Sequence, residues 1–166
     1  HNKGKLDRAL FEGATINTPS LLVIEDAIDA LSWAEEIGGI EALLKRVDTS
    51  FAHFMDWVGA SPHFEVLARD PATISPTALC LVISDDWFTA QPDEVQAGVV
   101  KSMLALLEAE DVAVDINAYR DAPTGLRIWG GPTVDPEDIA SLLPWLDWAY
   151  ETIRADLQDG SPHGDG

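Results

Sequence analysis

The spacing of apolar residues changes along this chain, and the change limits the folds that it can adopt. Two amphipathic stretches of helical period come first, and Gly38-Gly39 separates them. The run Thr77–Ser84 is instead continuously apolar, which is typical of a strand with both faces buried. Helical periodicity returns over residues 93–110 and again after Asp135-Pro136. This mixture predicts an α+β domain in which helices cover a small sheet.

Boundary residues refine this prediction to about four helices and about four short strands. The first helix is expected to begin with Thr18 as its N-cap, and the second to run from about Ile40 to Val58, so that a tight glycine turn joins two packed helices. The expected strands are residues 64–67, 77–84, 112–116 and 125–129. Together they make a small antiparallel or mixed sheet covered by the helices, an α/β sandwich.

The composition excludes several classes of protein. The 29 acidic and 10 basic residues give a net charge of −19, which argues against binding to nucleic acid or to an anionic membrane surface. The lone Cys80 excludes an internal disulfide framework and a Cys-rich zinc site. No apolar run reaches the roughly 20 residues of a membrane helix, and no signal peptide is visible. We therefore expect a cytoplasmic protein.

The two ends of the chain suggest how it is divided. It opens at His1, without Met, on a basic run, and this is expected of the middle of a longer protein. Residues 1–19 lack periodicity and are predicted to be an extended linker or active-site segment. Residues 20–157 are predicted to form one small domain, and residues 158–166, rich in Gly, Pro and Asp, a flexible tail.

Two arginines are the strongest candidates for a binding site. Arg120 and Arg127 flank residues 121–125, which places one in a loop and one at a strand, close enough to face one pocket. Arginine binds carboxylates and phosphates through two parallel hydrogen bonds. The pair therefore indicates a site for a doubly anionic small molecule. Two surface arginines paired with nearby aspartates would produce the same pattern.

A second candidate anion site precedes the first predicted helix. Helix N-termini bind phosphate through free N–H groups and the helix dipole, and Asn17, Thr15 and Thr18 add side-chain donors there. Simple N-capping by Thr18 is the alternative interpretation. Among the other ionisable residues, Lys45 and Lys101 are expected to be solvated on amphipathic helices.

The histidines indicate no metal site. His53 and His63 are expected to be ordinary surface or half-buried residues, because no His, Cys or carboxylate cluster has metal-ligand spacing. A metal-dependent hydrolase is therefore poorly supported.

Three segments resemble phosphoserine aminotransferase in the form found in alphaproteobacteria and some archaea. They are residues 3–6 and 11–20 with Glu25-Asp26, residues 119–129 (YRDAPTGLRIW) and residues 143–149 (LPWLDWA). The order is collinear over nearly the whole chain, which matches about the last two-fifths of the family's length. The resemblance implies a transferase of serine and often pyridoxine biosynthesis. Such enzymes are homodimers that use pyridoxal phosphate to move an amino group between O-phospho-L-serine and 2-oxoglutarate.

The resemblance also implies roles for individual residues and a fold like the small C-terminal domain of fold type I aminotransferases. Asn17 and Thr18 correspond to a segment that reaches the cofactor phosphate of the other subunit. Arg127 corresponds to the arginine that holds the substrate carboxylate, and Arg120 to the position associated with the substrate phosphate. Tyr119 stands where other branches often have His.

This sequence departs from the family in the residues needed for catalysis. The family's Schiff-base Lys and the Asp that pairs with the pyridine nitrogen belong to the large cofactor domain, which has no counterpart here, and the opening differs too much for Lys3 to be the catalytic Lys. No catalytic residue is therefore expected in this chain, which should be inactive alone and should not retain the cofactor. The alternative is a free-standing, non-catalytic module for anion binding or dimerisation.

Overall fold

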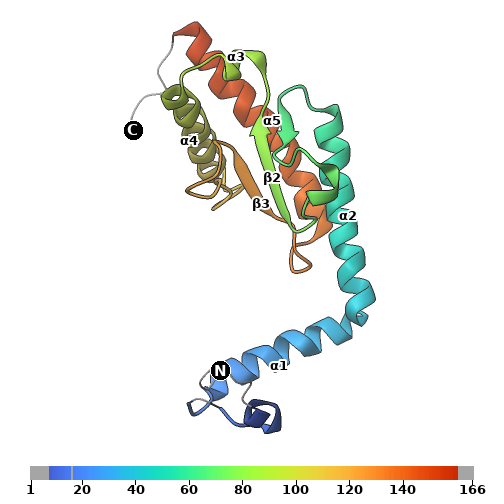
Figure 1. The fold of residues 1–166 in the computed structure, drawn as a ribbon. Coiled ribbons are helices and arrows are strands. Elements are labelled where there is room, and N and C mark those ends of the chain that lie inside the picture. Colours follow the sequence, from blue (N-terminus) through green and yellow to red (C-terminus); the bar gives the residue numbers. More distant parts are fainter. Residues whose placement is uncertain (1–7, 16, 161–166) are drawn as a thin grey trace. The chain divides into compact units, whose positions relative to one another are not determined.

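The structure is a computed structural model that describes residues 8–15 and 17–160 (Figure 1). The chain divides into two compact units, residues 1–43 and residues 44–166, and each is described by itself. This division falls within helix α2 (Gly39–Ala60), whereas the sequence placed a functional boundary at residues 19 and 20. The predictions for Lys3 and for most of the tail after residue 158 lie outside the described residues.

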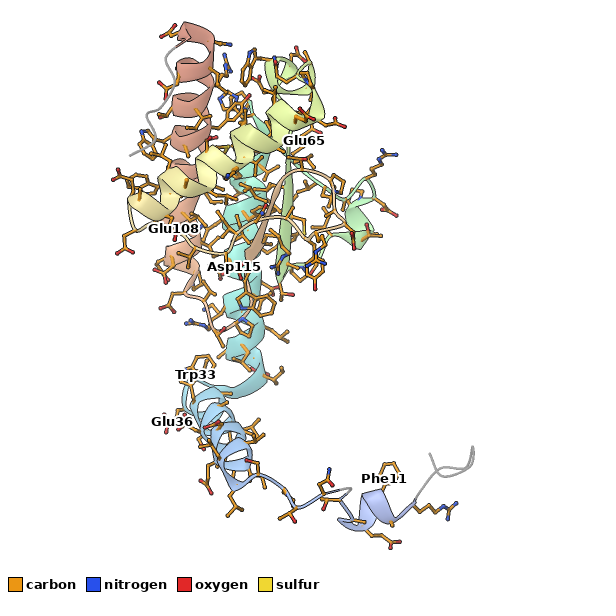
Figure 2. All side chains as sticks on the ribbon, turned by 90° about the vertical axis from the view of Figure 1, so that its left-hand side faces the viewer. Phe11, Trp33, Glu36, Glu65, Glu108 and Asp115 are labelled. Carbon is orange, nitrogen blue, oxygen red and sulfur yellow. The ribbon has the colours of Figure 1, made fainter. Side chains whose placement is uncertain are left out.

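The first unit contains helix α1 (Leu21–Glu36), which follows the short 3-10 helix η1 (Arg8–Glu12). The predicted helix is confirmed, and no residue of α1 is buried. Leu22 is 71% exposed, and Phe11 in η1 is 78% exposed (Figure 2). The buried apolar residues of the described chain all lie between Val47 and Ile153, so they belong to the second unit.

The second unit is an α+β domain, as predicted. Helices and strands are interspersed along it. Its elements after α2 are β1 (Phe64–Val66), η2 (Pro71–Thr73), β2 (Ala78–Ile83), α3 (Asp86–Thr89), α4 (Asp93–Ala109), β3 (Leu126–Trp129) and α5 (Pro136–Asp159). Helix α5 continues to Asp159 and ends at Gly160, which has the left-handed conformation that favours glycine.

The three strands form an antiparallel sheet in the order β1-β2-β3. Burial alternates along the central strand: Leu79, Leu81 and Ile83 are buried, whereas Ala78, Cys80 and Val82 are half-buried. The prediction that both faces of this strand are fully buried is therefore wrong. A continuous apolar run does not reveal that only one face of the sheet receives the core side chains of the helices.

Helices α2, α4 and α5 supply the core that covers the buried face. Phe54, Met103 and Leu146 come from these three helices in turn, and all are 0% exposed. Figure 1 shows α5 crossing behind β2, with α4 and α2 on either side of it. The indole N–H of Trp57 donates a hydrogen bond to the Asp147 carboxylate at 2.7 Å, which also ties α2 to α5. The sheet is thereby held on a three-helix layer.

The predicted strand at residues 112–116 is absent. Asp111 and Asp115 adopt positive φ angles of 56° and 55°, which interrupt an extended backbone (Asp115 is labelled in Figure 2). An isolated bridge between Asn117 and Leu126 is the pairing that remains there in the described chain. Residues 112–116 are therefore part of the loop between α4 and β3, and they do not form a fourth strand among the described residues.

Candidate functional site

The loop between α4 and β3 carries the first of the two predicted arginines. Backbone hydrogen bonds close its base: the Arg127 N–H donates to the Ile116 carbonyl at 2.8 Å, and the Ala118 N–H donates to the Gly125 carbonyl at 3.2 Å. Residues 118–125 are thus held as a hairpin loop against the sheet. We call them the arginine loop.

Gly125 fixes the end of the arginine loop against the central strand. A Cβ atom at this position would lie 2.1 Å from the Leu81 carbonyl oxygen, a separation that no real Cβ contact tolerates. The close backbone approach therefore requires glycine. It also explains why the loop returns to the sheet directly before Arg127.

Arg120 lines a hollow of about 250 Å³ between the arginine loop and α4. Lys101, on α4, lines the same hollow, and both cations are exposed at its surface. Val100, which is 4% exposed, contributes apolar surface to it. The remaining lining residues are uncharged: Ala97, Leu104, Asn117, Ala118, Tyr119, Ala122, Pro123, Thr124 and Gly125. No carboxylate lines this hollow, although the chain has 29 acidic residues.

Arg127 lies on β3, directly opposite Cys80 of β2, and so projects from the less buried face of the sheet. Its guanidinium carbon lies 5.7 Å from the centre of the Tyr119 ring, within the range of a cation–π interaction. Its Nε atom is buried and has no hydrogen-bond partner among the described residues. The side chain therefore has a hydrogen-bond donor that the described residues leave unused.

The two arginines are neighbours through Tyr119. This tyrosine lines the hollow that contains Arg120, and its ring stacks with Arg127, which is not among the residues that line the hollow. Neither arginine takes part in a salt bridge within residues 8–15 and 17–160, so pairing with local aspartates does not account for them. The arrangement presents two unneutralised guanidinium groups along one tyrosine side chain.

Asn17 and Thr18 belong to the other compact unit and are exposed. The prediction that Thr18 caps the first helix is wrong, because Ser20 is the N-cap of α1 and makes no side-chain capping hydrogen bond. The register is therefore two residues later than the sequence suggested. The Thr18 hydroxyl, not being the cap, remains available as a donor.

Pyridoxal phosphate is the cofactor that the resemblance implies, and Asn17 and Thr18 fit it in part. Their amide and hydroxyl groups can donate to phosphate oxygens. Both are exposed, so their donors are accessible to a phosphate group.

A polar cluster surrounds the buried His63 next to β1, and the sequence did not indicate it. The His63 side chain is 8% exposed, with Nδ1 3.5 Å from the Asp85 carboxylate and Nε2 3.2 Å from the Glu151 carboxylate. Arg154 pairs with Asp85 at 2.9 Å. The His63 ring also packs on Tyr150, with 4.8 Å between the ring centres. The prediction of a surface or half-buried His63 is wrong.

The surroundings of this cluster shift the pKa values of Asp85 and Tyr150. Burial acts to raise the pKa of Asp85, but the Tyr150 hydroxyl, the N–H groups of α3 and the Arg154 guanidinium together hold this pKa below its ordinary value. Burial raises the pKa of Tyr150, and the neighbouring Asp85 carboxylate raises it further. Asp85 also accepts hydrogen bonds from the N–H groups of Trp87 and Phe88, at 3.0 and 3.3 Å. The cluster therefore anchors α3 to α5.

A second hollow, of about 270 Å³, lies on the less buried face of the sheet. It is lined by Cys80 and Ala78 from β2, by Val66 and by the loop that contains η2. Its side chains are largely apolar and carry no charge. It therefore offers no cationic group that would bind an anion.

The described residues also give two negative findings. They contain no group of three or more His, Cys, Asp or Glu side chains arranged to hold a metal ion. None of the helices among them combines the length and the hydropathy that crossing a bilayer requires.

Comparison with curated proteins tests the resemblance. The chain is 38% identical, over 91% of its length, to a protein named phosphoserine aminotransferase in Methanosarcina mazei, and 39% identical over the same share to one of that name in Methanosarcina barkeri. It is 29% identical, over 84% of its length, to a putative phosphoserine aminotransferase of Mycobacterium sp. (strain KMS). No protein-family model matches the chain.

These similarities cover only part of each relative. The chain spans 38% of the length of the two Methanosarcina proteins and 35% of the mycobacterial one. The resemblance seen in the sequence is nevertheless confirmed, because it extends over nine-tenths of this chain. The chain is homologous to phosphoserine aminotransferases and corresponds to a part of such a protein.

Proposed function

We propose that this chain supplies the substrate-binding portion of a cytoplasmic phosphoserine aminotransferase. The reaction is amino transfer between O-phospho-L-serine and 2-oxoglutarate, in serine and pyridoxine biosynthesis. The homologous proteins carry the name of this enzyme. Both substrates are small polyanions, and the chain carries the cationic groups that such molecules need.

The single observation that carries the proposal is the pair of unneutralised arginines on the arginine loop and β3. In a chain of net charge −19, Arg120 and Arg127 make no salt bridge within the described residues, and Tyr119 contacts one and adjoins the other. Arg127, with a buried and unpaired Nε, binds the substrate α-carboxylate. Arg120, at the rim of an open hollow, binds the distal phosphate. Tyr119 positions the Arg127 guanidinium by stacking on it.

The cofactor chemistry requires residues beyond these. Pyridoxal phosphate supplies an electron sink when it is bound, and the protein orients it. Asn17 and Thr18 donate to its phosphate from the edge that this chain provides. Because the 166 residues contain no match to the family's Schiff-base Lys, we propose that they are inactive by themselves and do not retain the cofactor.

The exposed apolar side chains of α1 indicate the remaining partners. Leu21, Leu22 and Val23 are each more than 60% exposed, and Leu31 is 67% exposed on the same helix. Several large apolar side chains exposed on one helix indicate a protein interface. We propose that it packs against a cofactor-binding domain and a second subunit of a homodimer.

A free-standing anion-binding or dimerisation module remains the second candidate. One observation favours it: residues 44–166 have a continuous core of their own, with 19 buried members. Such a module would bind phosphorylated molecules without catalysis.

Kinetics of the complete aminotransferase that includes these residues test the proposal. Arg127→Ala should lower kcat/KM for both substrates by roughly 10- to 100-fold, because each loses a charge-assisted hydrogen-bonded contact. Arg120→Ala should do so mainly for O-phospho-L-serine. Arg69→Ala, at an exposed arginine outside the hollow, is the matched control and should change neither. Equal losses for both substrates in Arg120→Ala would contradict the assigned roles.

Mixing the isolated chain with pyridoxal phosphate tests the proposal that the chain alone is inactive and does not retain the cofactor. We expect no visible absorption band to survive dialysis and no amino transfer. A stable band that borohydride fixes on one lysine would contradict the proposal that the chain needs a separate cofactor domain. Specific phosphate binding without amino transfer by the complete protein would favour the free-standing module.

A further inference from the structure

Lys101 and Arg120 line the same hollow and come from two different elements. Lys101 comes from α4, where Ala97, Val100 and Leu104 line the same hollow at the i, i+3, i+4 and i+7 spacing of one helix face. Arg120 comes from the arginine loop. The two cations are 19 residues apart in sequence, and the fold places both on the wall of a space of about 250 Å³.

The charge balance of this hollow differs from that of the rest of the molecule. Acidic residues outnumber basic ones 29 to 10 in the chain, yet the lining contains two cations and no carboxylate. Arg46 and Arg154 show the usual arrangement, since each pairs with an aspartate. Neither Lys101 nor Arg120 makes an ion pair in the part of the chain that the structure describes. A hollow lined by two cations and no carboxylate favours an anionic ligand over a cationic one.

The other groups of the hollow suit a phosphate ester. The Thr124 hydroxyl, the Asn117 amide and the Tyr119 phenol are all able to donate hydrogen bonds at its surface. Val100 and Leu104 form an apolar wall against which the carbon atoms of a small ligand can lie. The volume is just below the range of about 300–1,000 Å³ found for drug-sized ligands, which fits a molecule of amino-acid size.

We infer that Lys101 is a second binding group for the phosphate monoester of the substrate and acts with Arg120 as a determinant of specificity. The inference rests on the proposed function for the identity of the substrate. It adds a residue from α4 that the sequence pattern marked as solvated. A lysine serves here as a point charge, while Arg120 supplies the directional hydrogen bonds.

The first experiment is an NMR titration of the 166-residue chain with inorganic phosphate, O-phospho-L-serine and L-serine at low ionic strength. The two phosphates should shift the amide signals of Lys101 and of residues 117–125, and L-serine should not. Lys101→Gln and Arg120→Gln should each weaken phosphate binding about tenfold, since each removes one charge-assisted contact. Lys45→Gln, at an exposed lysine of α2 outside the hollow, is the matched control and should leave binding unchanged.

Lys101→Arg distinguishes a charge requirement from a packing effect, and it should restore most of the affinity that Lys101→Gln loses. Phosphate binding that is unaffected by Lys101→Gln would overturn the inference. So would shifts spread evenly over the surface, because they indicate only non-specific attraction. Folding of each variant is checked by its unshifted core signals.

Steady-state kinetics of the complete aminotransferase separate this inference from the proposed function. Lys101→Gln should raise KM for O-phospho-L-serine about tenfold and leave KM for 2-oxoglutarate within about threefold, since the phosphate dianion has more charge to neutralise. An active enzyme with no response to Lys101→Gln would overturn the inference and leave the function intact. Phosphate binding at the hollow in a protein without transaminase activity would overturn the function alone.

Discussion

Residues 21–36 and residues 136–159 both form amphipathic helices, yet their apolar residues have opposite environments. Helix α5 buries seven residues against the sheet and its neighbouring helices, whereas α1 buries none. The two sequences have the same helical period, so periodicity does not account for the difference. What differs is the partner surface: residues 44–166 provide one for α5, and the unit that contains α1 has no described core.

The comparison teaches that an apolar stripe specifies a helix and the need for a partner, but not where the partner is. Short isolated helices are marginal in water, and in a folded protein packing usually supplies most of the stability of a helix. α1 has 16 residues and no buried side chain. In the isolated chain it should therefore be the less stable of the two.

Amide hydrogen exchange should show the largest difference between the two regions. We expect amides of β2 and the buried turns of α5 to exchange roughly a thousandfold or more slower than those of α1, because core amides open only on global unfolding. The measurement is exchange monitored by NMR or mass spectrometry on the 166-residue chain. Equal protection of α1 would break the comparison and indicate that self-association buries it, which dilution would then reverse.

Truncating one apolar side chain in each region should lower the free energy of unfolding by very different amounts, several kcal/mol apart. Phe54→Ala removes a fully buried ring, and we expect it to lower the free energy of unfolding by about 3–5 kcal/mol. Leu22→Ala, at a residue that is 71% exposed, should change it by less than about 0.5 kcal/mol. Urea denaturation measures both. A large loss in Leu22→Ala would show that α1 is packed in solution.

Acid should weaken the second region through Asp85. The pKa of this carboxyl is lower in the folded state than the ordinary 3.8, so its ionised form stabilises folding above that pH and the contribution disappears as pH falls through the lower folded value. Asp85→Asn should cost about 1–3 kcal/mol at neutral pH and should flatten the fall in stability at acid pH. Thermal unfolding from about pH 7 to about pH 2 tests this, since the loss is expected below the ordinary pKa of 3.8.

Asp70→Asn is the matched control for the acid experiment. Asp70 also caps a helical turn, by accepting a hydrogen bond from the Ala72 N–H at 3.0 Å, but it is exposed. Asparagine caps a helix about as well as aspartate does, so the change should be small at every pH. A parallel response of the two variants would mean that capping, rather than the Arg154 pair, explains the role of Asp85.

Helix propensity gives the smallest expected difference. Ala105→Gly in α4 should lower the free energy of unfolding by about 1 kcal/mol, because α4 belongs to the cooperative core. Ala27→Gly in α1 should reduce helical circular dichroism without moving the unfolding midpoint. Both residues are exposed, so no contact is lost. A shifted midpoint for Ala27→Gly would show that α1 unfolds together with the core.

Most elements of the fold could be predicted from the sequence because their signals are local. The helical stripes, three of the four predicted strands and the α+β class are confirmed. The strand expected at residues 112–116 failed because two aspartates adopt left-handed backbone angles, which residue type alone does not specify. The one-sided burial of β2 depends on which face the helices occupy, and that is a tertiary property.

The candidate site was predictable only in part, for the same reason. Arg120 and Arg127 were identifiable because few cations occur in an acidic chain. Lys101 was not, since its helix position does not reveal that the arginine loop lies beside it. The His63 cluster joins residues separated by as many as 91 positions, and no sequence spacing indicates it. The family was identified by resemblance, which spacing alone would not have achieved.

The closed base of the arginine loop has a consequence for how this protein can change over evolution. The backbone pairs at residues 116–118 and 125–127 and the glycine contact with Leu81 hold both ends of the loop, independently of the side chains at its tip. Substitutions, insertions or deletions at residues 121–123 can therefore reshape the rim of the hollow while the sheet keeps its register. Preference for one anion over another can diverge at the tip without loss of the fold that supports it.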